Sequence, residues 1–508
     1  MKGTKKIYRN ILTRRKLHGG QQMKGTAKHP SMKIKQNHTA KKRCFTDTQL
    51  SLHCKKPLHK FTSFEDDYVK SSAYKVAKNH NEVEKYLQDM FTKPYSPVTT
   101  RLQDNFYDHV NYTWLKHNKI SVDERYIVQV DNFRITQYKV YNELIEITKT
   151  YLKKNHSKEA KQIGALYKSA CKFVTLPQCL KYATQYVDMM NTMMQDKSNL
   201  WQFLATINRN EIYAWGSPFV FSLAGDSKNS DIYRCYVQPP KLTLTDLTIY
   251  FDDGNDVKYK ANFKKVYFKY IHDMFTIFFG PKHGFKPVDI FNVESKILNA
   301  MGCEGQKENP DFNNRVTADE ALKKYNFDWT EFSKAMGFKQ TPKFFITGSV
   351  NYLKCCSDML LADWTSTEWR TYFIYIFIRQ IARWSWEPRK VYYKFNDEYV
   401  EGEKSDMPQR LIPVFAMALA YNTFLTNQYI DTYNIEENAR YVEAMAYDLK
   451  SVFIRRIKRN NWLDPKTKSH ALRKLDKIKM IIGTPKVMRP DPIIDYNPND
   501  LWENVVKC

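Results

Sequence analysis

Acidic residues are missing from the first 46 positions of this 508-residue chain. Residues 1–95 contain 22 lysines and arginines against 7 acidic residues, an excess of 15 in a chain whose net charge is +26. Such a segment cannot bury enough apolar surface to offset the entropy lost on ordering. We predict a basic, disordered tail over residues 1–60. An organelle-targeting peptide and an anchor to an anionic surface are the alternatives.

Long apolar runs are missing as well. The most apolar stretches, Thr371–Ile378 and Pro413–Leu425, are interrupted by Arg379 and Asn422. Both stretches fall short of the roughly 20 residues that a membrane-spanning helix needs. No apolar run follows the basic start, as a secretory signal would require. The sequence therefore predicts a soluble, intracellular protein without a transmembrane segment.

No C-x-x-C pair occurs among the nine cysteines, which excludes a zinc knuckle and a dithiol redox motif. Their odd number in so long a chain does not predict a disulfide framework. We therefore expect free thiols in a reducing compartment. G-x-S-x-G, P-loop and dinucleotide motifs are also absent, so the sequence identifies no catalytic residue.

What the chain does contain is helical periodicity. A hydrophobic content of 43% predicts a globular protein with a sizeable core, divided into about two lobes at this length. A short helix over Asn81–Phe91, stopped by Pro94, marks a transition segment over residues 61–95. Apolar residues at steps of three and four then predict a mainly α-helical chain. The predicted helices are Asn132–Lys153, Lys158–Cys171, Leu180–Asp196, Ala261–Phe279, Thr317–Tyr325, Thr367–Trp384, Pro408–Asn427 and Glu436–Lys458.

Strand patterns are few and short. They cover Phe219–Leu223, Arg234–Gln238 and Lys390–Phe395, the first two with glycine or proline turn residues nearby.

A helix with both ends specified is predicted near residue 470. Asp464 can accept backbone hydrogen bonds as the N-cap, Pro465 suits the first helical position, and Gly483 can close the helix. Ala471, Leu475, Ile478 and Ile482 recur at helical steps and are predicted to form one buried stripe.

Three ordered motifs carry a family resemblance. The first is Asp104-x-Phe106-Tyr107 with Trp114, the second is Asp226-Ser227-Lys228-Asn229-Ser230 with Tyr233, and the third is W-L-D-x-x-T-K-x-x-A-x-x-K-L-x-x-I-x-x-x-I-G-x-P. The third spans Trp462 to Pro485 and includes Asp464, Thr467, Ala471, Lys474 and Gly483. Together they resemble the amino-terminal region of the neprilysin and endothelin-converting-enzyme family of zinc endopeptidases, over residues 96–486.

The resemblance implies a fold and a missing region. The implied fold of this chain is the family's mainly helical lid over a closed chamber, with a few short strands. Residues 487–508 would be a truncated linker toward a zinc-binding region that this chain does not contain. Two family cysteines are replaced, one by Asn111 within Asn111-Tyr112 and one by Val414, which again favours a protein that is not secreted.

Zinc chemistry can be tested on the sequence. The family binds zinc through H-E-x-x-H, where two histidines four residues apart hold the metal and the glutamate acts as base. None of the 12 histidines here precedes a glutamate, and no two stand four apart. Glu437-Asn438 begins like the family's E-N-x-x-D ligand motif, but Tyr441 replaces the aspartate. We therefore expect no metal ligand, cofactor or catalytic residue, and no peptidase activity from this chain alone.

Three functions remain open on the sequence. In the first, the chain is a non-catalytic family member, a pseudoenzyme or remnant, that binds peptides or a protein partner as a lid. Alternatively, it is one half of a split endopeptidase completed by a separate zinc-binding chain. The third function, from another class, is binding of nucleic acid or another polyanion through the basic tail, which predicts salt-sensitive affinity.

Overall fold

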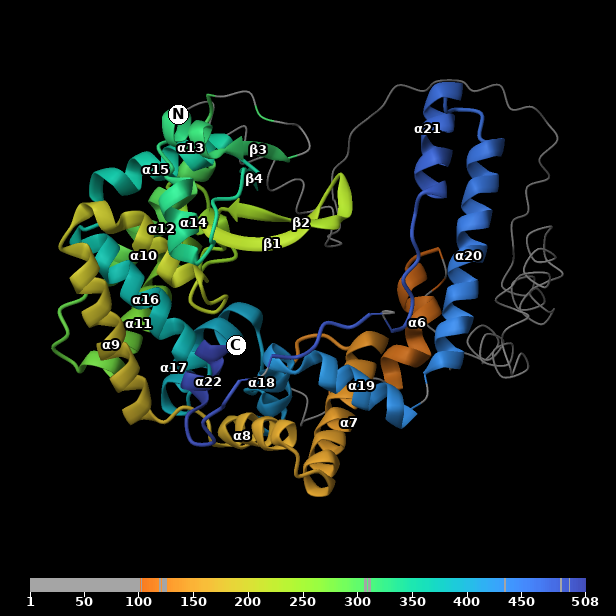
Figure 1. Ribbon diagram of the computed structural model, residues 1–508, viewed down its shortest axis with the longest axis horizontal. Helices are drawn as coiled ribbons and strands as arrows, with labels where there is room; N and C mark the ends of the chain where they lie inside the picture. The colour runs from red at the N-terminus through yellow and green to blue at the C-terminus, as the bar shows by residue number, and fades with distance from the viewer. Residues whose placement is uncertain are drawn as a thin grey trace.

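A computed structural model describes residues 101, 103–117, 120, 126–305, 308, 312–433, 435–484, 487–492 and 494–508. The predicted tail, the helix over residues 81–91 and Pro485 lie outside these residues. The described chain is mainly helical and contains one small four-stranded sheet, which confirms the predicted fold class (Figure 1). No helix among the described residues is long and apolar enough to span a membrane.

The helices fall into three groups in Figure 1. The large lobe contains the sheet, α9 (Leu176–Met194), α10 (Leu200–Asn208), α11 (Val257–Phe279), α12 (Pro287–Met301), α13 (Ala318–Tyr325), α14 (Trp329–Met336), α15 (Val350–Asp363), α16 (Thr367–Arg383), α17 (Glu387–Tyr393) and α22 (Leu501–Lys507). The base contains α7 (Asn132–Lys154), α8 (Lys158–Lys172), α18 (Ile412–Ala420) and α19 (Asn422–Tyr433). The arm is formed by α20 (Glu436–Arg459) and α21 (Pro465–Asp476), and α6 (Phe106–His117) lies on the same side of the molecule.

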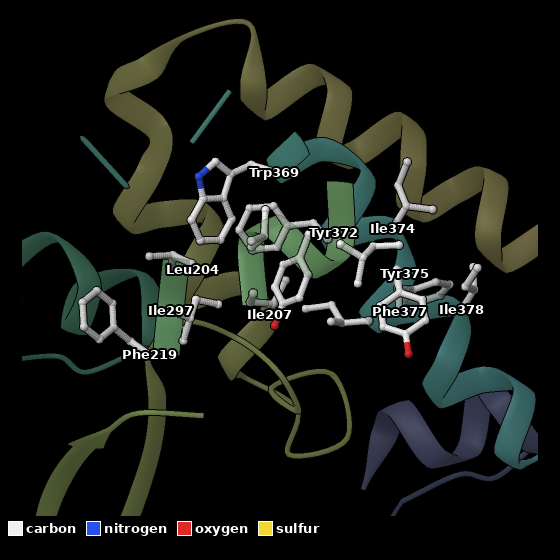
Figure 2. Packing of buried hydrophobic residues seen from close by; sticks show 14 of the residues in the cluster. Leu204, Ile207, Phe219, Ile297, Trp369, Tyr372, Ile374, Tyr375, Phe377 and Ile378 are labelled. Carbon is white, nitrogen blue, oxygen red and sulfur yellow. The ribbon is translucent and has the colours of Figure 1, made fainter. Parts of the chain in front are cut away.

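Helix α16 is the centre of the large lobe. Its residues Thr371–Ala382 are all buried, so the helix is enclosed on every side, as expected for a helix without a polar face. Figure 2 shows Trp369, Tyr372 and Phe377 among the side chains that fill this core. Each fully buried side chain of this size contributes about 1.5–3 kcal/mol relative to an exposed one.

The sheet has the strand order β1-β2-β4-β3. Strands β1 (Val220–Asp226) and β2 (Asn229–Gln238) form an antiparallel hairpin, which confirms and extends the first two predicted strands. β2 pairs in parallel with β4 (Phe344–Thr347), and β3 (Asn314–Thr317) pairs antiparallel with β4. The sequence patterns did not identify β3 and β4.

The third predicted strand is wrong. Residues 390–395 belong to α17 and to the π-helix η5 (Lys394–Glu401). Tyr392 and Phe395 are buried there, and Phe395 stacks on Tyr270 of α11 with ring centroids 4.6 Å apart. Aromatic residues suit a strand or a buried helix, and this tertiary contact selects the helix.

One predicted helix is interrupted. Residues 408–427 form the 3-10 turn η6 (Gln409–Leu411), α18 and α19, with a break at Tyr421. The backbone N–H groups of Thr423 and Phe424 donate to the Asp491 carboxylate at 3.0 and 2.6 Å. Asp491 thus caps α19 from a distant part of the chain, and this contact accounts for the new helix start. The other predicted helices from residue 132 to 458 are confirmed within a few residues, while α10, α12, α14, α15 and α22 were not predicted.

Helix α21 begins as predicted and ends early. Asp464 accepts hydrogen bonds from the backbone N–H groups of Lys466 and Thr467, and Pro465 is the first helical residue. The helix stops at Asp476, so the predicted end at Gly483 is wrong. Of the predicted stripe only Leu475 is buried, and Ile478 is 47% exposed. Helices depend mainly on packing of their apolar face, which explains the shorter helix.

The carboxy-terminal residues are part of the core, and the linker role expected of residues 487–508 stays a prediction. Trp502 of α22 is fully buried and stacks on Tyr213 at 5.7 Å between ring centroids. The Asn504 amide donates to the Ser169 hydroxyl of α8 at 2.9 Å. Residues 501–507 therefore join the large lobe to the base.

Two of the cysteines form a disulfide, so the expectation that all of the thiols are free is wrong. Cys303, just after α12, forms a disulfide with Cys355 of α15. The other cysteines of the described residues are free: Cys171, Cys179, Cys235, Cys356 and Cys508. A persistent disulfide is typical of an oxidising environment, so the cysteines do not support the predicted reducing compartment.

Candidate functional site

The turn between β1 and β2 carries the D-S-K-N-S motif. Asp226 ends β1 and is 3% exposed, and its carboxylate accepts a hydrogen bond from the backbone N–H of Lys228 at 2.9 Å. Asn229 accepts one from the N–H of Asp231 at 3.2 Å. These side-chain-to-backbone bonds are the kind that aspartate and asparagine contribute to tight turns.

Two arginines converge on the Asp226 carboxylate. Arg234 of β2 donates from Nε at 3.0 Å, and Arg315 of β3 donates from Nη2 at 2.7 Å. Both guanidinium groups lie 5.0 Å from the ring centroid of Phe344, which is on the strand between them. The Lys228 N–H and the Arg234 guanidinium hold the pKa of Asp226 below its ordinary value. The Asp226 carboxylate of β1 therefore contacts arginines of two other strands, β2 and β3, which lie on either side of the strand that carries Phe344.

A cavity of about 340 Å³ lies beside this cluster. Its lining combines two cationic side chains, two amides, one carboxylate and apolar surface. Glu320 is already engaged, because it caps α13 through Thr317 and pairs with Lys324 at 3.0 Å. The two amide groups already donate within the protein, to Ser227 and to the Thr347 and Gly348 carbonyls. The Lys228 ammonium and the further N–H groups of the Arg315 guanidinium are the donors that suit a carboxylate or a peptide carbonyl group. The lining residues are Lys228, Asn313, Asn314, Arg315, Val316, Glu320, Tyr325 and Val350.

The other motif residues lie elsewhere in the fold. On α6 and just before it, Asp104 pairs with Arg101 at 2.7 Å, Phe106 and Tyr107 are exposed, and Trp114 is half-buried. On the arm, Trp462 is 78% exposed and Asp464 caps α21, which carries Thr467, Ala471 and Lys474. Gly483 has a φ of +70°, the left-handed conformation expected of it.

The three motifs do not form one cluster of side chains. In the hairpin, Lys228, Asn229, Ser230 and Tyr233 are exposed. One contact does connect the hairpin to the segment after α21: the Lys479 ammonium lies 3.1 Å from the Asp231 carboxylate, and both side chains are largely exposed. Figure 1 shows the hairpin extending from the large lobe toward the arm.

Sequence patterns missed two residues of this site, Arg234 and Arg315. A buried carboxylate needs a cationic partner, so Arg234 could have been found from its place in the same hairpin. Arg315 is 89 residues from Asp226 in the chain, and only the sheet topology places it there.

A zinc site would need His, Cys, Asp or Glu side chains close together. Among the described ranges no group of three His, Cys, Asp or Glu residues could hold a metal ion. His272 and His283 do approach each other, with ring centroids 5.0 Å apart. However, His283 Nδ1 accepts a hydrogen bond from the Phe285 N–H, and burial lowers the pKa of His283. A zinc site needs three or four protein ligands, so this pair does not fit one.

The fold is similar to that of zinc metalloproteases. The crystal structure of zinc metalloprotease Zmp1 from Mycobacterium tuberculosis, in complex with an inhibitor, matches 81% of this chain with a TM-score of 0.68 and 18% identity. The same protein in its open state, seen by cryo-electron microscopy, matches 80% with a TM-score of 0.58 and 20% identity. PepO from Lactobacillus rhamnosis HN001 matches 80% with a TM-score of 0.63 and 16% identity.

The amino-terminal model of peptidase family M13 matches residues 102–485, and the chain belongs to that family. This confirms the resemblance found in the three motifs. No curated protein sequence matches the chain. The chain covers 62% of the length of Zmp1 in both structures and 64% of PepO.

Proposed function

We propose that this chain binds a peptide or protein as the lid region of a neprilysin-like metallopeptidase and does not cleave peptides by itself. The observation that carries the proposal is the absence of H-E-x-x-H from all 508 residues of a member of family M13. The cavity beside Lys228 and Arg315 supports the binding role, because its donors suit the carboxylate or carbonyl groups of a peptide.

The test is a zinc determination on the purified chain combined with cleavage of a quenched fluorescent peptide, with and without a chelator. We expect neither bound zinc nor chelator-sensitive cleavage. Stoichiometric zinc with chelator-sensitive cleavage would refute the proposal. Peptide binding is measured separately by fluorescence anisotropy, and Lys228→Ala is expected to weaken it. Lys339→Ala, at an exposed lysine of the same lobe, is the matched control.

The second candidate function is one half of a split endopeptidase. It rests on the resemblance to a family of zinc endopeptidases together with the absence of H-E-x-x-H from these 508 residues. Adding a separate chain that contains H-E-x-x-H would then restore chelator-sensitive cleavage. The same mixture without cleavage or complex formation would count against a split enzyme.

A third candidate is polyanion binding by the basic tail, which is favoured by the excess of 15 positive charges in residues 1–95. Deletion of residues 1–60 would abolish a salt-sensitive affinity for nucleic acid, because release of counterions dominates such binding. Affinity that survives this deletion would exclude the tail as the binding element.

A further inference from the structure

The turn that joins α20 to α21 is a fixed structure with an exposed tryptophan. The Asn460 side-chain oxygen accepts hydrogen bonds from the N–H groups of Trp462 and Leu463, both at 2.9 Å. Lys468 closes the turn by donating to the backbone carbonyls of Lys458 and Asn460. Trp462 is nevertheless 78% exposed. The turn therefore presents a large indole to the surroundings while its backbone is held in place.

Positive charge surrounds this indole. Residues 455–468, which we call the arm tip, contain six lysines and arginines and one acidic residue. That acidic residue, Asp464, is the N-cap of α21. A cavity of about 510 Å³ at the end of α20 is lined by Arg455, Arg456, Arg459 and Asn460. This concave cationic surface fits a phosphate or carboxylate group.

The position of the arm tip makes it accessible. Helix α20 has 24 residues and is therefore about 36 Å long. Figure 1 shows the arm tip at the end of this helix, away from the base. The arm tip therefore lies at the far end of two helices, apart from the base.

We propose that the arm tip binds the surface of an anionic lipid bilayer, with the Trp462 indole at the headgroup level and lipid phosphates in the arginine-lined cavity. Tryptophan is enriched at membrane interfaces, and lysines and arginines near an anionic leaflet strengthen attachment. Combining an apolar insertion with basic charge supplies the two signals that stable attachment needs. This inference is independent of the proposed peptide-binding function.

Charge alone would also suit nucleic acid, but the shape of the arm tip favours a lipid surface. Proteins that bind single strands place several aromatic rings along a groove, so that successive bases can stack. Here the apex carries one aromatic ring, followed by the aliphatic Leu463. An apolar pair at the end of a helical hairpin, Trp462 and Leu463, suits insertion among lipid headgroups better than stacking on successive nucleic-acid bases.

The experiment is sedimentation of the full chain with phosphatidylcholine vesicles and with vesicles that also contain phosphatidylserine. We expect binding only to the anionic vesicles. Replacing two cationic side chains, in Arg459→Gln with Lys466→Gln, is expected to weaken the partition coefficient by roughly tenfold or more. Trp462→Ala is expected to weaken it by about tenfold. The basic tail is present in every variant, so differences among them report the arm tip.

Matched controls are available in the large lobe. Lys334→Gln with Lys339→Gln removes the same charge from exposed lysines, and Leu322→Ala removes a side chain that is 52% exposed. Both controls are expected to bind like the original chain, and circular dichroism checks that all variants fold. Unchanged partition in the two arm-tip variants would overturn the proposal. So would equal losses in the controls, or binding of a single-stranded oligonucleotide, but not of vesicles, that depends on the arm tip.

Discussion

At the scale of single residues, Asp226 shows how one buried carboxylate organises a surface. Its oxygens hold a turn N–H and two arginines that come from separate strands. The cationic groups beside the cavity therefore have fixed positions, and a ligand would not have to order them. Such preorganisation strengthens binding because less conformational freedom is lost.

Asp226→Asn keeps the shape of this side chain and removes its charge. We expect a lower midpoint of denaturant unfolding with an unchanged slope, because the two guanidinium groups lose their counterion. Asp231→Asn is the control, since its pair with Lys479 is exposed and exposed pairs contribute little to stability. Equal midpoints for the two variants would show that the buried cluster is not stabilising.

A second prediction at this scale concerns Glu403, just after the π-helix η5. Burial and the nearby Asp397 carboxylate raise the pKa of Glu403 from 4.5 to about 7. Because the pKa is higher in the folded state than in the unfolded state, folding favours the protonated carboxyl group of Glu403. The stability that Glu403 contributes is therefore complete below about pH 4 and is lost as the pH rises through 7. Glu403→Gln is expected to raise the melting temperature at pH 8 relative to the original chain, with little difference at pH 4.

The control for this titration is Glu211→Gln, at an exposed glutamate in another part of the chain. It is expected to leave the pH dependence of the melting temperature unchanged. If Glu403→Gln and the original chain showed parallel melting curves from pH 4 to pH 8, the raised pKa would be refuted.

At the scale of elements, α22 is a short helix whose largest buried side chain is Trp502. Trp502 lies between Tyr213 and Phe377, both from other parts of the large lobe. Trp502→Ala leaves a large cavity and is expected to cost about 3–5 kcal/mol of unfolding free energy. Lys507→Ala on the same helix is expected to change it little. A loss below about 1 kcal/mol for Trp502→Ala would indicate that α22 detaches readily from the core.

Elements also differ in how far the sequence predicts them. Helices with clear periodicity, such as Asn132–Lys154, follow from local patterns alone. The break at Tyr421 and the strand β4 do not, because a distant carboxylate and neighbouring strands create them. The same holds for the candidate site: the D-S-K-N-S turn was recognisable, whereas the role of Arg315 depends on the sheet.

At the scale of the whole molecule, the Cys303–Cys355 disulfide joins the end of α12 to α15 and closes a loop of 52 residues. Cys303→Ser is expected to cost about 2–4 kcal/mol under oxidising conditions and nothing after reduction. Cys171→Ser, at an exposed free cysteine, is the control. Identical unfolding midpoints with and without reductant would show that this bond does not form in the protein.

The parallel pairing of β2 with β4 also bears on how the chain acquires its shape. Tyr236 meets Ile346 only after all of α11 to α14 has been synthesised. Until then one side of the β1–β2 hairpin is an open edge, whose unpaired backbone groups can pair with another chain. Pairings so distant in sequence form slowly. Nascent chains that stop between these two strands are therefore the species most exposed to aggregation, and the species for which a chaperone would matter most.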